Sequence, residues 1–310
     1  MSKTALFFPG QASQYVGMGR DLYDNSAEVR RMYELVSDLL EIDIAKLSFD
    51  GPAEELKRTK FTQPAIMLHS LAVLTVLGED RPKFEFAAGH SLGEYAALAV
   101  TGALSFDSAL KAVVRRATLM EEACRQNPGT MAAVMGLSEE QLEGVCREAS
   151  SAGVVVPANY NSANQIVISG SLAGVEKAVT LAKQAGAKRA TLLEVGGAFH
   201  SPLMRPAQDG LRDFLRDTPI AAPTVPVVAN VTGLPVRNGE EIRALLVDQV
   251  TAPVRWAQTM KTLADSGVSK VMEIGPGKVL TGMAKREMPL SETANLDTLA
   301  DIRALAAVGA

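Results

Sequence analysis

The chain has 310 residues, of which 47% are apolar and 21% are charged. This length fits one large domain, alone or with a smaller insert, and the composition excludes disordered, collagen-like and coiled-coil chains. The formal net charge of −4 excludes a general electrostatic attraction to nucleic acids or anionic membranes.

The cysteine content and the apolar runs indicate a cytoplasmic protein. Cys124 and Cys146 are the two cysteines, and both fall in helical patterns, which predicts reduced thiols instead of a disulfide framework. The apolar run within the first eight residues is too short for the hydrophobic region of a signal peptide. The longest apolar run, residues 95–104, falls short of the roughly 18 residues of a membrane span, so we expect no membrane segment.

The first third of the chain alternates between strand and helix patterns. Apolar runs at 5–8 and 84–88 predict buried strands that end at glycines, and amphipathic stretches at 28–40 and 65–77 predict helices between them. This alternation is typical of a mainly parallel sheet covered by helices on both faces.

The middle of the chain has a different order of elements. Ser138 is the expected cap of one helix, with Gln141 at the capping-box position. The order is strand, helix, strand, strand, helix, strand, which is that of a ferredoxin-like α+β unit. The predicted elements are strands 131–135, 154–158, 165–169 and 189–195 and helices 138–149 and 172–185.

The α/β alternation then resumes, so the large domain is predicted to be discontinuous. It comprises residues 1–127 and 198–310, and the inserted ferredoxin-like subdomain comprises residues 128–197. No periodic element is evident after Pro289. The predicted later elements are helices 202–216, 240–250 and 254–266 and strands 225–229 and 271–274.

The segment Gly89–Glu94 reads Gly-His-Ser-Leu-Gly-Glu and stands between a predicted strand and a helical pattern at 94–104. The motif G-x-S-x-G in this setting is typical of a nucleophile elbow, where the glycines permit a sharp turn that exposes the serine. Ser91 is therefore the candidate nucleophile. The alternative is a plain glycine-flanked turn.

A serine nucleophile needs a general base, and the chain has three histidines. His69 falls in an apolar helical pattern and is expected to be buried, and His90 adjoins Ser91, where the turn makes a productive contact awkward. His200, in a glycine-rich loop between a strand and a helix, is the expected base.

No carboxylate in a loop setting stands between the serine and the histidine. Asp107, Glu121 and Glu194 occur there, but none resembles the acid loop of a hydrolase. We therefore expect a neutral group, such as a backbone carbonyl or an amide, to orient the imidazole.

The loop after the first strand, Pro9–Gln14, is a candidate second oxyanion donor, the alternative being a simple turn. Nucleotide binding is not expected there or at Gly275–Lys278, because neither loop has the spacing of a dinucleotide or phosphate loop. 

Taken together, the chain resembles the malonyl-CoA:acyl carrier protein transacylase family from the first strand to about Met283. The resemblance implies a hydrolase-like, mainly parallel α/β domain with a ferredoxin-like insert. The segments that carry it are Phe8–Gln11, Gly89–Tyr95, Arg115–Arg116, Asn159–Ser162, Gln165–Gly170, Gly197–Ser201, Asn230 and Glu273–Gly277.

The resemblance assigns a role to each matching residue. Ser91 is the acylated nucleophile, and His200 acts as base and then as acid. The backbone N–H groups of Gln11 and Leu92 form the oxyanion hole. Gln249 matches a glutamine whose main-chain carbonyl orients the histidine.

Further matches concern substrate selection. Arg116 matches the arginine that holds the free malonyl carboxylate through two parallel hydrogen bonds, whereas Arg115 is expected to be exposed. Phe199 is typical of members that leave little room for a methyl branch. The family usually has glycine at the position of Ala12, and alanine fits there only with a negative φ, so we expect a slightly reshaped loop.

The predicted reaction is a ping-pong transfer of malonyl from malonyl-CoA to the phosphopantetheine thiol of acyl carrier protein, without a metal or redox cofactor. Lys188 and Arg189 are candidate docking residues for this acidic partner, the alternative being an ordinary solvated pair. Nucleic acid and membrane are not expected partners, and the oligomeric state stays open, with a monomer compatible.

Three alternatives remain open from sequence. A serine thioesterase or esterase would use the same nucleophile and base with water as acceptor, and an acyltransferase of a polyketide pathway would use another carrier protein. A catalytically silent carrier-binding subunit would retain only the fold.

Overall fold

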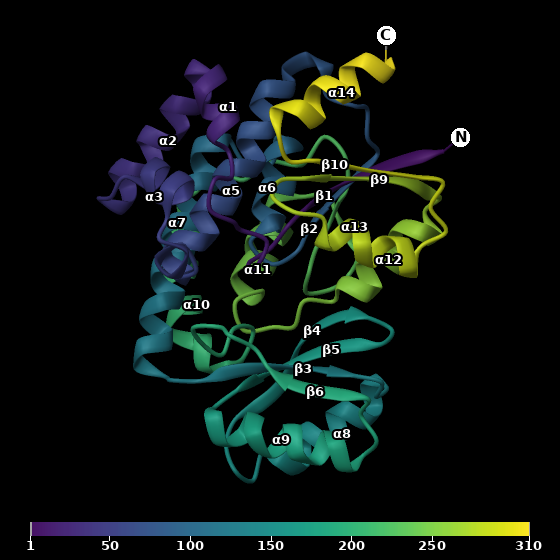
Figure 1. Cartoon of the computed structure of the whole chain (residues 1–310). Helices are drawn as coiled ribbons and strands as arrows, with labels where there is room; N and C mark the ends of the chain where they lie inside the picture. Colours follow the sequence, from purple (N-terminus) through teal and green to yellow (C-terminus); the bar gives the residue numbers. More distant parts are fainter. Residues whose placement is uncertain (1, 310) are drawn as a thin grey trace.

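The computed structural model describes residues 2–309 and contains two sheets in separate parts of the chain (Figure 1). The large sheet has the order β10-β9-β1-β2-β7-β8, and neighbouring strands are parallel except for β7 and β8. Its strands are β1 (Lys3–Phe8), β2 (Phe86–Gly89), β7 (Val227–Val228), β8 (Pro235–Val236), β9 (Val268–Ile274) and β10 (Glu292–Leu296). The mainly parallel α/β sheet predicted from the sequence is confirmed.

Helices cover both faces of this sheet. Its helices are α1 (Arg20–Asn25), α2 (Ala27–Leu40), α3 (Ile44–Asp50), α4 (Ala53–Leu56), α5 (Thr59–Leu77), α6 (Gly93–Val100), α7 (Phe106–Gln126), α10 (Arg205–Arg216), α11 (Gly239–Asp248), α12 (Trp256–Asp265), α13 (Val279–Glu287) and α14 (Leu299–Gly309), with short 3-10 turns at Gly78–Asp80 and Pro202–Met204.

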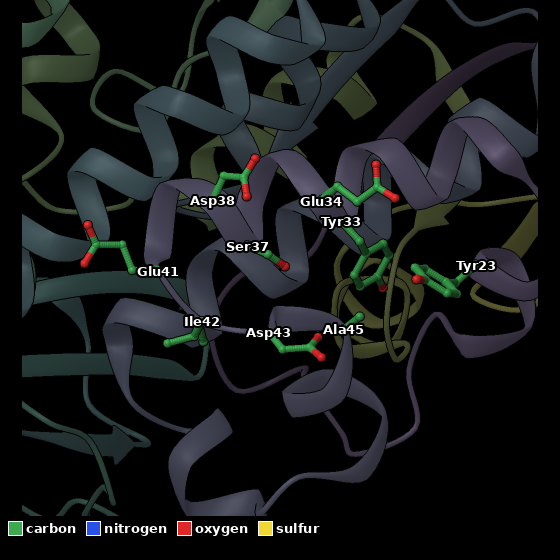
Figure 2. A pocket seen from close by; sticks show the side chains of 9 residues that line it. All are labelled: Tyr23, Tyr33, Glu34, Ser37, Asp38, Glu41, Ile42, Asp43 and Ala45. Carbon is green, nitrogen blue, oxygen red and sulfur yellow. The ribbon is translucent and has the colours of Figure 1, made fainter.

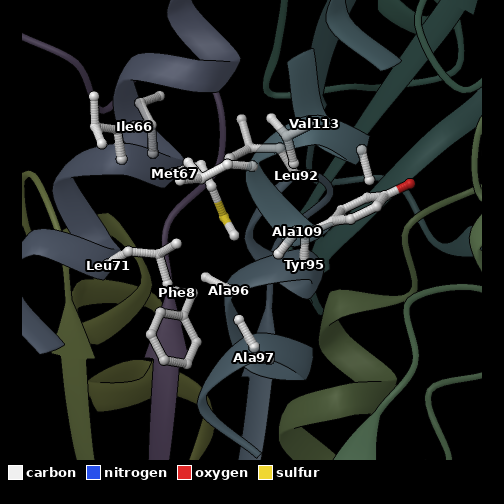
Figure 3. Close-up of a cluster of buried hydrophobic side chains, with 14 of the residues drawn as sticks. Phe8, Ile66, Met67, Leu71, Leu92, Tyr95, Ala96, Ala97, Ala109 and Val113 are labelled. Atoms are coloured by element: carbon white, nitrogen blue, oxygen red, sulfur yellow. The ribbon is translucent and has the colours of Figure 1, made fainter. Parts of the chain in front are cut away.

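Residues 5–8 of the central strand β1 are apolar because they are buried on both faces. Leu6 and Phe8 pack into the cluster formed with α5, α6 and α7, in which Figure 3 shows Phe8. Ala5 and Phe7 pack on the opposite side against α12 and α13. Alternate side chains of a strand point to opposite faces, so one apolar run supplies two cores.

The smaller sheet is antiparallel and has the order β4-β5-β3-β6. Its elements are β3 (Thr130–Met135), α8 (Glu139–Ala149), β4 (Val155–Ser162), β5 (Gln165–Gly170), α9 (Leu172–Gln184) and β6 (Arg189–Leu192). Ser138 and Gln141 form the predicted capping box at the start of α8. Figure 1 shows α8 and α9 on the face of this sheet that points away from the large sheet.

Several elements differ from the sequence predictions. The helix expected at 65–77 begins at Thr59, so Pro64 lies inside α5, and the helical pattern around Cys124, for which no range was predicted, is the long helix α7. No element was predicted after Pro289, but this segment forms β10 and α14. Most of β10 is half-exposed, so it lacks the apolar pattern by which strands are predicted, and its pairing with β9 fixes it instead.

The longest apolar run was expected at residues 95–104, and no membrane segment was predicted. Residues 59–80 nevertheless form a helical stretch that is long and apolar enough to cross a membrane by length and composition, but 83% of an 18-residue window within it is buried in the fold. The apolar character of this segment is explained by its place in the core between the sheet and α7. Both cysteines are free thiols, and burial raises the pKa of each to about 12.

Candidate active site

Ser91 lies in a sharp turn between β2 and α6. Its φ of 52° is left-handed, and the turn is tight because a Cβ on Gly93 would lie 2.2 Å from the carbonyl oxygen of Phe8. The backbone N–H of Ser91 donates to Asn230 Oδ1 at 2.7 Å. These contacts expose the hydroxyl at the carboxyl end of β2, as a nucleophile elbow requires.

His200 meets the serine from a loop distant in the sequence. Its Nε2 lies 2.9 Å from Ser91 Oγ, and its Nδ1 lies 2.8 Å from the main-chain oxygen of Gln249 and 3.2 Å from that of Ala252. Two carbonyl acceptors require the proton on Nδ1, which leaves Nε2 free to accept a proton from the serine. The neutral orienting group expected from the sequence is thus a pair of main-chain carbonyls.

Burial determines the charge state of this histidine. Only 4% of His200 is exposed, and desolvation, followed by the nearby charge of Arg116, lowers the pKa of His200 to about 3. The imidazole is therefore neutral at pH 7 and able to act as a base.

Arg116 enters the same site from α7 and is 1% exposed, whereas its neighbour Arg115 is exposed. Its Nη2 donates to Ser91 Oγ at 2.9 Å and to Gln249 Oε1 at 3.0 Å, and its Nη1 donates to Gln63 Oε1 at 2.5 Å. Within residues 2–309 its Nε has no partner and no carboxylate forms an ion pair with it. A buried guanidinium without a counterion is suited to bind an anionic ligand.

Two backbone N–H groups next to the serine are free to bind a ligand. Among the described residues, neither the N–H of Gln11 nor that of Leu92 has a hydrogen-bond partner. The loop that carries Gln11 is braced by bonds from Ser13 Oγ to the Gly10 oxygen and from the Ala12 N–H to Gln14 Oε1.

Ala12 corrects one expectation from the sequence. Its φ is +79°, so alanine is held in the left-handed conformation that favours glycine. The loop accommodates this φ, because the two bracing hydrogen bonds hold the backbone and the side chain of Ala12 is exposed.

A cleft opens over these groups. A cavity of about 130 Å³ includes Ser91, His200, Gln11, Leu92 and Phe199 in its lining. A second cavity of about 230 Å³ shares part of this lining, including Gln11 and Asn159, and continues along the small sheet and α13.

The small sheet contributes alternate side chains to this cleft. In β3, Met131 and Ala133 line the cavities, whereas Ala132 and Val134 pack against α8 and α9. The smaller unit therefore forms one wall of the site.

A larger hollow lies elsewhere and contains none of the predicted site residues. Figure 2 shows it over α2, with a lining that includes the acidic residues Glu34, Asp38, Glu41 and Asp43. Its lining contains no histidine that could act as a base for a serine nucleophile, so the cleft around Ser91 is the candidate active site.

The remaining predicted residues lie apart from the site. Lys188 and Arg189 are exposed at the start of β6, whereas Leu193 beyond its other end lines the cleft. Leu193 is four residue steps from Arg189, which corresponds to about 13 Å of extended chain.

The other two histidines bind other side chains, and His90 also lines the cleft. His90 Nε2 lies 3.0 Å from Asn161 Oδ1, and His69 is fully buried with its Nε2 2.9 Å from Asp297 Oδ1. Within residues 2–309, no group of three or more potential ligands is placed to hold a metal ion.

Three side chains around the site were not singled out from the sequence. Gln63 binds Arg116, Glu94 binds the side chain of Gln249, and Asn161 binds His90. Glu94 and Asn161 lie inside quoted motifs, so the motifs themselves were the available signal. Gln63 lies in an apolar helix, and the only sequence feature that could have indicated its role is a single amide among apolar residues.

The fold and the site together define the class of the protein. A model of the acyl transferase domain matches residues 6–302, and the chain belongs to this family. It is 44% identical over 287 residues to the malonyl CoA-acyl carrier protein transacylase of Bacillus subtilis (strain 168), with 92% of this chain and 90% of the relative covered. The relative of the same name from Escherichia coli (strain K12) is 42% identical, with 92% and 93% covered.

Solved structures agree with this family. An acyl carrier protein S-malonyltransferase from Vibrio cholerae O1 biovar eltor has a TM-score of 0.92 at 40% identity, with 98% of this chain and 100% of that chain covered. A malonyl-transacylase solved in complex with a type II PKS acyl-carrier protein has a TM-score of 0.92 at 39% identity, with 98% and 99% covered. The family resemblance seen in the sequence is confirmed.

Proposed function

We propose that this protein transfers the malonyl group of malonyl-CoA to the phosphopantetheine thiol of acyl carrier protein in fatty acid biosynthesis. The observation that carries the proposal is the buried guanidinium of Arg116, which has no counterion among residues 2–309 and lies beside the Ser91–His200 pair. The names of relatives that are 42–44% identical support the same activity.

The first half-reaction forms a malonyl ester on the enzyme. His200 Nε2 takes the proton of Ser91 as Oγ attacks the thioester carbonyl, and the N–H groups of Gln11 and Leu92 stabilise the resulting oxyanion. The C–S bond then breaks, and the departing coenzyme A sulfur receives the proton from His200. The carbonyls of Gln249 and Ala252 keep the imidazole in the required tautomer throughout.

The second half-reaction reverses these steps with another thiol. The phosphopantetheine thiol gives its proton to His200 and attacks the malonyl ester, and Ser91 leaves and regains a proton. Nucleophile, base and oxyanion donors supply all the chemistry that the transfer needs, so no metal or redox cofactor is part of the proposal.

Arg116 accounts for the choice of a charged acyl group. In the structure the guanidinium donates to Ser91 Oγ. When a malonyl group is bound, we expect the guanidinium to bind the free carboxylate of that group. Phe199, buried in the cavity wall beside His200, restricts the space for a methyl branch on that group.

The architecture assigned to this activity has two parts. We assign residues 1–127 and 198–310 to a hydrolase-like catalytic domain and residues 128–197 to a ferredoxin-like subdomain, on the basis of the strand order β4-β5-β3-β6 with α8 and α9 on one face. We further place the protein in the cytoplasm, without a membrane or nucleic-acid partner, and leave its oligomeric state open.

The decisive experiment is the intact mass of the protein and of Ser91→Ala after brief mixing with malonyl-CoA, followed by phosphopantetheinylated acyl carrier protein. We expect a malonyl adduct on the parent alone, which then moves to the carrier protein. Loss of the adduct as free malonate regardless of carrier would instead establish a thioesterase. Failure to form any adduct would leave a carrier-binding subunit. Parallel reactions with carrier proteins of fatty acid and polyketide systems distinguish those two pathways.

The role of Arg116 is tested by Arg116→Ala, with the exposed Arg115→Ala as the matched control. Loss of one partner of a buried charge pair costs about 2–5 kcal/mol. The kcat/KM of Arg116→Ala for malonyl transfer is therefore expected to fall by the factor that corresponds to this free energy, whereas the kcat/KM of Arg115→Ala stays near that of the parent. An Arg116→Ala protein that transfers malonyl as well as the parent would contradict the assignment.

A further inference from the structure

We infer that Glu94 is a positioning residue, whose carboxylate acceptor holds Gln249 and Asn230 and thereby fixes the carboxylate-binding arginine and the nucleophile turn. Glu94 is the second residue of α6 and is 2% exposed. The inference rests on the proposed function, because it concerns how that site selects a malonyl group.

The first contact of Glu94 orients an amide. Gln249 Nε2 donates to Glu94 Oε2 at 2.7 Å and to the main-chain oxygen of Ser91 at 3.0 Å. Both partners are acceptors, so the NH₂ end of the amide must face them and its oxygen must face the other way. That oxygen, Oε1, accepts from Arg116 Nη2 at 3.0 Å.

This orientation matters for the charge that Arg116 presents. A reversed amide would place an NH₂ group against the guanidinium, and the bond that holds Nη2 would be lost. A direct ion pair between Glu94 and Arg116 would neutralise the guanidinium before substrate arrives. The interposed Gln249 keeps the acid close while leaving the arginine free to bind a carboxylate.

The second contact of Glu94 holds the turn that carries the nucleophile. The backbone N–H of Asn230 donates to Glu94 Oε2 at 3.1 Å, and the Asn230 side chain donates to the Gly89 oxygen and accepts from the Ser91 N–H, each at 2.7 Å. One carboxylate oxygen thus connects the loops that follow β7 and α11 to the serine turn.

The burial of these groups makes the contacts strong. Gln249 and Asn230 are completely buried, so an N–H without its acceptor is left unsatisfied in the core. Desolvation raises the pKa of Glu94 to about 7, and the bonds from Gln249 and Asn230 oppose this rise. Since both bonds end on Oε2, either protonation state can keep the acceptor in place.

The test compares Glu94→Leu, which removes the acceptor, with Glu94→Gln, whose amide oxygen can replace Oε2 without its charge. Serine acylation is measured with malonyl-CoA and with acetyl-CoA, which lacks the carboxylate. For Glu94→Leu we expect kcat/KM for malonyl-CoA to fall at least about 30-fold, with a raised KM, and the malonyl-to-acetyl ratio to fall at least about 10-fold. Glu94→Gln is expected to stay within about 5-fold of the parent.

Two further variants separate positioning from general damage. Gln249→Leu keeps the main-chain carbonyl that His200 uses and is expected to reproduce the loss of malonyl preference; it also replaces Glu94→Leu if that protein does not fold. Glu273→Gln alters another fully buried carboxylate, which binds the N-terminus of α13, and should leave the malonyl-to-acetyl ratio unchanged.

The outcomes are distinguishable from failure of the proposed function. If the parent forms no malonyl adduct, the function itself is wrong. If the parent is malonylated, an unchanged ratio in the variant that removes the acceptor, or equal losses in Glu94→Leu and Glu94→Gln, overturns the positioning role.

Discussion

Ala12 occupies the left-handed backbone region in the loop that carries Gln11, the proposed oxyanion donor. The left-handed conformation costs an L-residue roughly 1–2 kcal/mol, whereas glycine adopts it freely at some cost in chain entropy. Ala12→Gly is therefore expected to raise the free energy of unfolding by about 0.5–1 kcal/mol in urea titrations.

The matched control for this prediction is Ala304→Gly, at an exposed position inside α14. Glycine in the interior of a helix lowers stability by about 1 kcal/mol, so the two substitutions should have opposite signs. Equal destabilisation in both proteins would show that Ala12 is not strained.

His200 makes stability depend on pH because it is buried as a neutral group. The unfolded chain takes up a proton near pH 6.5, whereas the folded chain resists until about pH 3. Below pH 6.5 the unfolded state therefore binds more protons, and the free energy of unfolding falls by up to about 1.4 kcal/mol per pH unit.

This slope is measured by comparing the parent with His200→Asn in denaturant titrations from pH 7 to pH 4.5. The parent should lose stability relative to the variant as the pH falls. Comparing the two proteins also separates His200 from Glu94, whose raised pKa acts in the opposite direction. Parallel curves for the two proteins would contradict a buried neutral imidazole.

At the scale of elements, the unit formed by β2, the serine turn and α6 depends on close backbone packing. A Cβ on Gly93 would lie 2.2 Å from the Phe8 carbonyl oxygen, whereas a Cβ on Gly282 inside α13 meets nothing within 4 Å. Gly93→Ala is expected to destabilise by at least about 3 kcal/mol through overpacking, and Gly282→Ala to stabilise by about 0.5–1 kcal/mol. Thermal unfolding of both variants tests this, and a stable Gly93→Ala protein would contradict the packing described.

The elements that could be predicted from the sequence are those with a strong local pattern. The apolar run of β1, the capping box of α8 and the Gly-x-Ser-x-Gly turn each indicate their structure within a few residues. In contrast, β10 is held in place by pairing with β9, and a local sequence pattern does not indicate such a contact between distant segments. Pro64 resembles a helix boundary in the sequence, although it lies inside α5 in the structure.

The same distinction separates the parts of the site. Ser91 and His200 lie in loops whose glycines and neighbours mark them in the sequence. The link from Glu94 through Gln249 to Arg116 joins α6, the end of α11 and α7, and no local pattern indicates which buried amide meets which charge. Ala12 is a local case that also could not be predicted. Its φ depends on hydrogen bonds within its own loop, and the sequence does not reveal these bonds.

At the scale of the whole molecule, docking of an acidic carrier protein needs a local positive surface because the net charge is −4. We propose that Lys188 and Arg189 form this positive surface. Both are exposed at one end of β6 and have no ion-pair partner among residues 2–309. Their charge reversal to Glu should raise the KM for carrier protein on the order of 10-fold and leave acylation by malonyl-CoA unchanged, with the difference shrinking in high salt.

The control for docking carries the same change of charge on the two helices of the subdomain, which lie on the face of the small sheet that points away from the large sheet (Figure 1). Arg147 in α8 and Lys177 in α9 are also exposed, and reversing both should leave the KM for carrier protein near the parent value. Similar increases in KM for the two double variants would indicate a long-range charge effect and would contradict docking at Lys188 and Arg189.

The position of β1 has a consequence for how the chain is made. This strand is synthesised before both of its neighbours in the sheet, and it pairs with β2 on one side and with β9 on the other. At 5–20 residues per second, roughly ten to forty seconds pass between the synthesis of β2 and that of β9. During that time the apolar edge of β1 has no permanent partner, and such an edge is a template for aggregation. We therefore expect the nascent chain to need a chaperone most between the emergence of residues 89 and 274.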